Sequence, residues 1–127
     1  MAVARSGFVS LDCSDPVALG EFWAAMLGGE IVFTNAAGTT VGIRTDWVWL
    51  TALQVPDYVA PTWPDGDVPK QIHLDLAVTE LDVAVAEAER LGARVAPFQP
   101  APDRWRVLFD PAGHPFCLTT QIPPEAR

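Results

Sequence analysis

Two segments of the chain carry apolar residues at helical spacing. In each segment the apolar side chains recur three or four positions apart, which places them along one side of a helix. The first stripe consists of Leu19, Phe22, Trp23, Met26 and Leu27. The second stripe consists of Leu81, Ala84, Val85, Ala88 and Leu91. The pattern therefore predicts two helices, each with one face buried against a neighbouring element.

Residues typical of helix ends flank both stripes. Before the first stripe, Asp15 is a suitable N-cap and Pro16 suits the first turn, while Gly28 after it can adopt the left-handed conformation that stops a helix. The second stripe opens with Thr-Glu-Leu-Asp at 79–82, which resembles a capping box, and it ends before Gly92. We expect the helices to begin and end at these residues.

Short runs typical of β-strands stand before and after each helix. The strands predicted before the helices are 9–13 and 72–76. Those predicted after the first helix are 31–34, 40–44 and 47–54, and those after the second are 94–97, 106–109 and 116–120. The chain thus contains two copies of a strand, a helix and three strands, which indicates an internal duplication. Ser10 corresponds to His73 and Asp12 to Asp75 in this repeat.

The repeat predicts an α+β fold in which two tandem βαβββ modules, at 6–54 and 71–120, form a curved mixed sheet around a cleft. One helix covers only one face of a four-stranded sheet, so the other face of each module is left open to line that cleft. Residues 55–70 between the modules hold four of the twelve prolines, too many for a helix or strand. We expect this segment to be a connector, and it is also a candidate lid.

Composition narrows the possible functions. The 127 residues are enough for one domain with its own core, and no charged-then-apolar leader opens the chain, so we expect neither a membrane protein nor a secreted precursor. A net charge of −8 repels phosphate backbones and anionic lipids, which disfavours nucleic-acid and membrane partners. The two cysteines form no CxxC motif and no disulfide framework, so we expect a reduced, cytoplasmic protein.

Five tryptophans are more than the core of so small a domain requires. Trp23 belongs to the first helical stripe, whereas Trp47 and Trp49 stand two positions apart and are predicted to share one face of a strand. Indole rings suit the walls of a pocket for a flat ligand, and they also suit packing at a sheet or dimer interface. The candidate ligand-lining residues are Phe8, Ser10, Trp47, Trp49, Trp63, Trp105 and Cys117.

Three strings carry a family resemblance: LDCSDPVALGEFWAAMLGG at 11–29, QIHLDLAVTELDVAVAEAERLGA at 71–93 and VLFDPAGHPFCLTT at 107–120. In order and spacing they resemble the vicinal oxygen chelate superfamily, which includes glyoxalase I, bleomycin-resistance proteins and extradiol dioxygenases. LQVPDY at 53–58 and Trp63 resemble its small glyoxalase-like subgroup. The resemblance implies the paired-module fold but no single function, because the superfamily contains lyases, epimerases, oxygenases and drug binders.

The resemblance also implies four metal-ligand positions in the metal-dependent members. These positions fall on Ser10, on residues 50–52, on His73 and on Cys117, where the family usually has Glu. His73 is the only usual family ligand among them, and catalytic metal sites generally need three protein ligands. We therefore predict no tightly bound metal and no other cofactor, with a loosely held divalent ion as the alternative.

Each candidate residue has a chemical and a structural interpretation. His73 is the candidate catalytic residue, as a general base or weak metal ligand, although a neutral histidine hydrogen-bonded within the sheet fits the pattern as well. Cys117 would need a stabilised thiolate to act as a nucleophile, and it also fits as a small buried apolar residue. Asp12 and Asp75 occupy equivalent positions in the two modules. A position that is repeated in this way favours a structural task over acid–base chemistry.

Three classes of function follow from these features. The first, which we predict, is a binder of a small, partly aromatic molecule that needs no tightly bound metal. The second is a lyase or isomerase that uses His73 as its base, with a divalent ion held loosely by Asp75 or Cys117. The third is an interaction module whose dimer interface matters more than its cleft. The predicted partners are a small-molecule ligand and a second copy of the chain in a homodimer, and the cleft is completed either within one chain or by exchange of halves between two.

Overall fold

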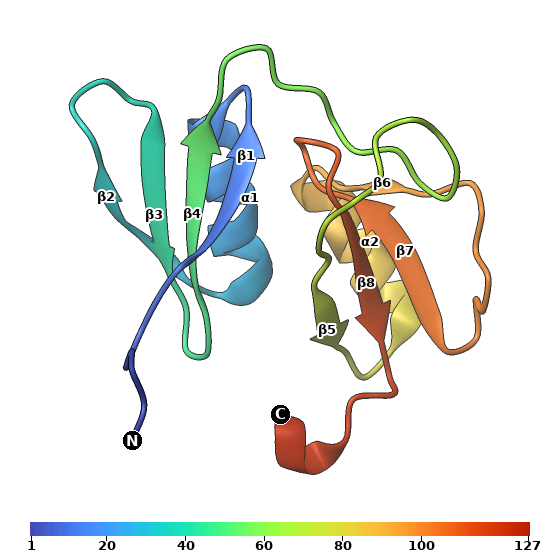
Figure 1. The fold of residues 1–127 in the computed structure, drawn as a ribbon. Helices are drawn as coiled ribbons and strands as arrows, with labels where there is room; N and C mark the ends of the chain where they lie inside the picture. The colour runs from blue at the N-terminus through green and yellow to red at the C-terminus, as the bar shows by residue number, and fades with distance from the viewer. The chain divides into compact units, whose positions relative to one another are not determined.

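The chain folds into two compact units, Met1–Tyr58 and Val59–Arg127, in a computed structural model that describes residues 1–127. Each unit contains one α-helix and one four-stranded mixed sheet (Figure 1). The predicted α+β class and the two βαβββ repeats are therefore confirmed. The boundary between the units falls inside the segment 55–70, which forms no helix or strand and only one isolated bridge, between Thr62 and Pro69.

The first unit has five elements in the predicted order: β1 (Val9–Cys13), α1 (Pro16–Leu27), β2 (Glu30–Thr34), β3 (Thr40–Arg44) and β4 (Trp49–Gln54). The strand order in the sheet is β1-β4-β3-β2, with β1 parallel to β4 and the other pairs antiparallel. Helix α1 packs on β3 and β4 and covers one face of this sheet.

Helix α1 begins and ends as its sequence predicts. The Ala18 N–H donates to Asp15 Oδ1 at 3.1 Å, which satisfies one of the free donors of the first turn. Gly28 has φ 62° and ψ 32°, and its N–H donates to the Ala24 carbonyl. Gly20 faces β3 so closely that an added Cβ would lie 2.7 Å from Val41 Cγ1, so this glycine allows the helix and sheet to approach.

The core of the first unit lies between α1 and its sheet. Because side chains alternate across a strand, every second residue of β1, β3 and β4 points toward the helix. The buried apolar residues of this unit are Leu11, Cys13, Leu19, Phe22, Trp23, Val41, Ile43, Leu50 and Ala52. The opposite face of the sheet carries the residues between them, among them Ser10 and Trp49, which are exposed.

The second unit repeats this topology with shorter outer strands. Its elements are β5 (Asp75–Ala77), α2 (Leu81–Leu91), β6 (Arg94–Val95), β7 (Trp105–Phe109), β8 (Pro115–Thr119) and a 3-10 turn at Pro124–Ala126. The strand order is β5-β8-β7-β6, with β5 parallel to β8. All five apolar residues predicted for the second stripe are buried or half-buried.

The predicted strand 72–76 is wrong at its start, because β5 begins only at Asp75. The only strand paired with β5 is β8, and the Cys117 N–H of β8 donates to the Leu74 carbonyl at 2.9 Å. Two residues earlier, β8 has Pro115, which has no N–H to continue the ladder. His73 therefore lies just before the strand rather than within it.

Two further local predictions are also wrong. The N-cap of α2 is Glu80, whose side chain makes no capping hydrogen bond, so no capping box forms. Strand β4 begins at Trp49, and Trp47 lies in the turn after β3, where its N–H and that of Val48 donate to Thr45 Oγ1. Trp47 and Val48, which the alternating pattern assigned to the strand, thus form part of the turn instead.

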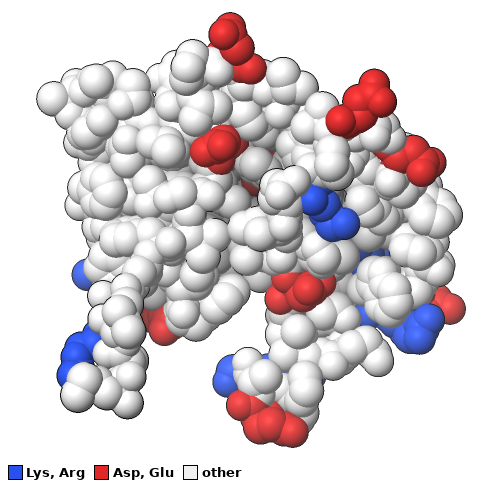
Figure 2. All heavy atoms as spheres, viewed as in Figure 1, with Lys and Arg blue, Asp and Glu red and all other residues white.

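Acidic and basic side chains both occur on the face seen in Figure 2, with uncharged surface between them. The formal charge of −8 comes from sixteen acidic and eight basic residues in the whole chain. Neither helix combines the length and the hydrophobicity that a membrane span requires.

Replacing the N-cap residue of α1 tests whether its side chain stabilises the helix and with it the folded chain. We expect Asp15→Ala to lower the free energy of unfolding by about 1 kcal/mol, because the Ala18 N–H loses its acceptor. The matched control is Glu80→Ala at the N-cap of α2, where no side-chain bond is lost and the change should stay within about 0.5 kcal/mol. Urea unfolding followed by circular dichroism measures both values. Equal losses in the two variants would contradict the assigned cap.

Candidate functional site

A pocket of about 470 Å³ opens on the second unit, on the face of its sheet opposite α2. The alternation of side chains on β7 and β8 selects this face: Trp105, Val107, Cys117 and Thr119 point to the pocket, while Leu108 and Leu118 are buried in the core. The polar residues that line the pocket are Lys70, His73, Asp75, Cys117, Thr119 and Gln121. The apolar lining residues are Trp63, Trp105, Val107, Pro115, Phe116 and Ile122.

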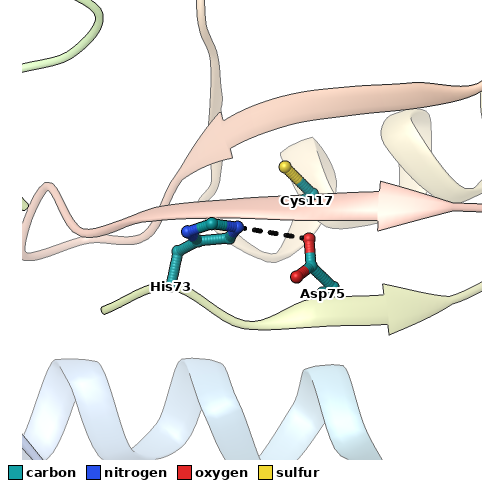
Figure 3. Close-up of side chains that lie close together, drawn as sticks. All are labelled: His73, Asp75 and Cys117. Atoms are coloured by element: carbon teal, nitrogen blue, oxygen red, sulfur yellow. Dashed lines mark ion pairs between the residues drawn. The ribbon is translucent and has the colours of Figure 1, made fainter. Parts of the chain in front are cut away.

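Three of the polar residues form a cluster through the pairing of β5 with β8. Asp75 and Cys117 are direct partners in this parallel pair, and His73 stands two positions before Asp75 on the same side of the chain. His73 Nε2 lies 3.3 Å from Asp75 Oδ1, and the donor atoms of all three residues lie within 4.8 Å of one another. Figure 3 shows the imidazole and the carboxylate turned toward each other, with the thiol on the neighbouring strand.

The cluster offers one nitrogen, one oxygen and one sulfur donor, all of which are ligands of divalent metal ions. The prediction of no tightly bound metal rested on donors at the implied family positions, and Asp75 is not one of those positions. The structure places the donors of the alternative prediction, His73, Asp75 and Cys117, next to one another. The side chains of His73 and Asp75 are 34% and 53% exposed, so both can reach a bound group.

The environment of Cys117 favours its neutral thiol. Burial, and to a lesser extent the negative charge of Asp75 and a hydrogen bond to it, raise the pKa of the Cys117 thiol to about 11, while Lys70 acts in the opposite direction. The thiol is thus protonated near neutral pH when no cation is bound. This agrees with the interpretation of Cys117 as a small, partly buried residue rather than a thiolate nucleophile.

Two tryptophans form the apolar walls of the pocket. Trp63 comes from the segment between the modules and Trp105 from the start of β7, and both pack against the buried residues Ala96, Val107 and Phe109. The Trp63 ring also lies 5.8 Å from the ring of Phe98, and the Arg104 guanidinium lies 4.9 Å from the centre of the Trp105 ring. Both indoles are half-buried, so each leaves part of its surface for a ligand.

The other predicted site residues belong to the first unit. Phe8 contacts Trp49 edge to face, with 5.4 Å between the ring centres, and it contacts Phe33 in the same way at 6.2 Å. Ser10 follows on β1 and is exposed. Trp47 is 62% exposed in its turn and does not share a strand face with Trp49. The eight predicted residues thus fall into a pocket group in the second unit and an aromatic group in the first.

Sequence reasoning missed several residues of the pocket, including Lys70, Val107, Gln121 and Ile122. It also judged Asp75 mainly as a structural residue. One signal was available for Asp75, because its spacing of two from His73 places both side chains on one side of an extended segment. No comparable pattern marks Gln121 and Ile122, since they follow the last strand.

The raised pKa of Cys117 predicts slow alkylation of the metal-free protein. At pH 8 a thiol of pKa about 11 has roughly a hundredfold less thiolate than an ordinary cysteine, and the rate should rise as pH increases toward 11. Asp75→Asn should lower this pKa and speed the reaction at pH 8. Iodoacetamide labelling followed by mass spectrometry measures the rates, and Cys117→Ser is the control because Cys13 is fully buried. Rapid labelling of Cys117 at pH 7 would contradict the expected environment.

Comparison with known structures shows that other proteins share the fold of this chain. The fosfomycin resistance protein FosX from Mesorhizobium loti superposes with a TM-score of 0.70 at 14% identity, covering 98% of this chain and 97% of that one. FosX from Listeria monocytogenes, in complex with Mn(II) and 1S,2S-dihydroxypropylphosphonic acid, gives 0.71 at 16% identity, with 96% and 93% covered. The bleomycin-binding protein from Streptomyces verticillus, in complex with copper(II)-bleomycin, gives 0.61 at 20% identity, with 96% and 100% covered.

Sequence comparison gives a family as well as a fold. No curated protein matched the chain in sequence. The profile of the glyoxalase-like domain matches residues 8–119, which includes both modules and every residue of the His73, Asp75 and Cys117 cluster. The chain therefore belongs to the glyoxalase-like domain family, as the sequence resemblance predicted.

Proposed function

We propose that the protein binds a small, partly aromatic molecule in the pocket of its second unit. The observation that carries this proposal is the pocket itself: about 470 Å³ lies within the range of roughly 300–1,000 Å³ that is typical of small-molecule sites. Trp63 and Trp105 supply flat apolar walls, and polar side chains stand together where Asp75 of β5, with His73 just before it, meets Cys117 of β8. A few grouped polar atoms in an apolar pocket are suited to orient one ligand.

The charges around the pocket further restrict the ligand. Although the chain carries a net charge of −8, the pocket is lined by one cation, Lys70, and one carboxylate, Asp75, together with His73. These charges offset each other, so we expect a ligand that is neutral or that carries both signs. The bleomycin-binding protein and FosX, which share the fold, were crystallised with small molecules, and this supports the same kind of use here.

The indole walls provide the test of this proposal. Bleomycin, fosfomycin and a set of flat heterocyclic compounds would be titrated against the metal-free protein while tryptophan fluorescence is followed. For any compound that binds, Trp105→Phe and Trp63→Phe should each weaken affinity about tenfold, or 1.4 kcal/mol, because the ligand loses part of its stacking surface. Trp47→Phe is the matched control, since this residue is exposed and lies outside the pocket.

Two outcomes would contradict the binding proposal. One is that no compound in the panel changes the fluorescence of the wild-type protein. The other is that Trp47→Phe weakens binding as much as Trp63→Phe or Trp105→Phe, which would place the ligand elsewhere.

The contact between His73 and Asp75 favours a second function, that of a lyase or isomerase. A carboxylate 3.3 Å from an imidazole nitrogen can hold the ring in one orientation, as general-base histidines require. The pocket then holds the substrate beside the base. Under this proposal His73 removes a proton from the bound substrate, and Asp75 holds the imidazole ring of His73 in position.

If His73 is the catalytic base, its replacement should reduce turnover much more than substrate binding. Fosfomycin would be incubated with the protein and Mn²⁺, and phosphorus NMR would detect any new phosphonate. If turnover occurs, His73→Gln should reduce kcat by about a hundredfold or more, the usual scale of general-base catalysis, with a much smaller effect on KM. Asp12→Asn, which alters the equivalent carboxylate of the first unit, should leave kcat unchanged. Full activity in His73→Gln would exclude this role.

A further inference from the structure

We infer that the ligand of the pocket is a flat aromatic molecule with an anionic group such as a carboxylate, and that Lys70 binds this group. The inference rests on the small-molecule binding proposed above and names the chemical class of the ligand. Three observations carry it. Lys70 has no partner in the protein, the carboxylate of the pocket already has partners, and the loop that ends just before Lys70 also presents an indole to the pocket.

Lys70 is the only lysine of the chain, and it is half-buried where it lines the pocket. None of the four ion pairs of the chain includes it, and its ammonium makes no hydrogen bond to the protein. By contrast, each of the six arginines from Arg44 to Arg127 contacts a carboxylate, an aromatic ring or a carbonyl oxygen. The ammonium of Lys70 is therefore a positive charge that a ligand can use.

Asp75 is the only carboxylate that lines the pocket, and it already has partners. Its Oδ1 lies 3.3 Å from His73 Nε2, and its side chain makes a hydrogen bond with the Cys117 thiol. A positive group of a ligand would have to compete with these two contacts, whereas a negative group finds Lys70 without a competitor. Of the ligands that the charge balance allows, these contacts favour one with an anionic group.

A loop closed by Thr62 brings the ammonium and an indole to the same pocket. The Thr62 N–H donates to the Val68 carbonyl at 2.6 Å, and the Val68 N–H donates to Thr62 Oγ1 at 3.2 Å. The bridge between Thr62 and Pro69 is parallel, so the residues that follow them, Trp63 and Lys70, leave it in the same direction. Both of these residues line the pocket. A ligand whose ring lies on Trp63 can thus direct a group on that ring to Lys70.

The apolar walls of the pocket strengthen the contact between the ammonium and an anion. Trp105, Val107 and Ile122 line the same pocket, and an aromatic ligand seated among them excludes water from the space around it. Opposite charges attract more strongly where water is excluded, and dissolved salt screens them less there than at an exposed surface. One anionic group beside a flat ring therefore uses both kinds of surface that the pocket offers.

Three probes with the same ring separate the effect of charge from that of the apolar walls. At pH 7, 2-naphthoate is negative, 2-naphthamide is neutral and 2-naphthylmethylamine is positive. Calorimetric titration of the metal-free protein should show that 2-naphthoate binds about tenfold more tightly than 2-naphthamide, which is the scale of a hydrogen bond to a charged group. Equal affinities of these two probes, or tighter binding of the amine, would overturn the inference and leave the binding proposal intact. Binding of none of the three would contradict both.

Variants assign the effect of charge to Lys70. Lys70→Met removes the charge and keeps most of the side-chain length, so it should weaken binding of 2-naphthoate about tenfold and leave 2-naphthamide unchanged. Lys70→Arg, which keeps the charge, should retain most of the affinity. Arg5→Met is the matched control, because it removes one positive charge from an exposed residue outside the pocket. Equal weakening by Arg5→Met and Lys70→Met would overturn the inference.

The single lysine also allows a test on the unaltered chain, which decides the matter if Lys70→Met does not fold. Sulfo-NHS acetate acetylates amines, and the chain has only the Lys70 amine and the N-terminal α-amine. Bound 2-naphthoate should slow acetylation of Lys70 in proportion to its occupancy, while 2-naphthamide at the same concentration should slow it far less. Peptide mass spectrometry measures both amines, and the α-amine serves as the internal reference. Unchanged acetylation of Lys70 at saturating 2-naphthoate would overturn the inference.

Discussion

The parallel pairing of β5 with β8 is the constraint on which the candidate site depends. It places Asp75 beside Cys117, and the alternation of side chains then brings His73 to the same side. The same alternation directs Trp105 and Val107 of β7 into the pocket, because β7 pairs with β8 through Val107 and Cys117. A shift of one residue in either pairing would turn these side chains toward α2 and remove the site.

Local features of the fold could be predicted from the sequence, because their causes are local. The start of α1 depends on Asp15 and its end on Gly28, both adjacent to the helix they limit. The two-module repeat was visible for the same reason, since each module carries its own helix and turns. One strand prediction failed because a distant residue decides: β5 starts late because its partner strand begins with Pro115, some forty positions away.

The candidate site was only partly predictable for a related physical reason. His73 and Cys117 could be named one by one, but nothing in the local pattern says that Asp75 and Cys117 are paired across two strands. That relation depends on strand register, which is set by the packing of the whole unit. Trp47 illustrates the opposite error, because alternation suggested a strand face where a turn built around Thr45 Oγ1 was needed.

Comparison of the two repeats explains why only the second unit has a cluster of His, Asp and Cys side chains. In the first unit the pairing of β1 with β4 places Asp12 opposite Leu53, the same relation that places Asp75 opposite Cys117 in the second. Ser10 there occupies the position equivalent to His73. The backbone geometry is thus repeated, yet the first unit has an alcohol and an apolar side chain where the second has an imidazole and a thiol. Two side-chain differences on a common framework are therefore enough to confine the cluster of His73, Asp75 and Cys117 to the second unit.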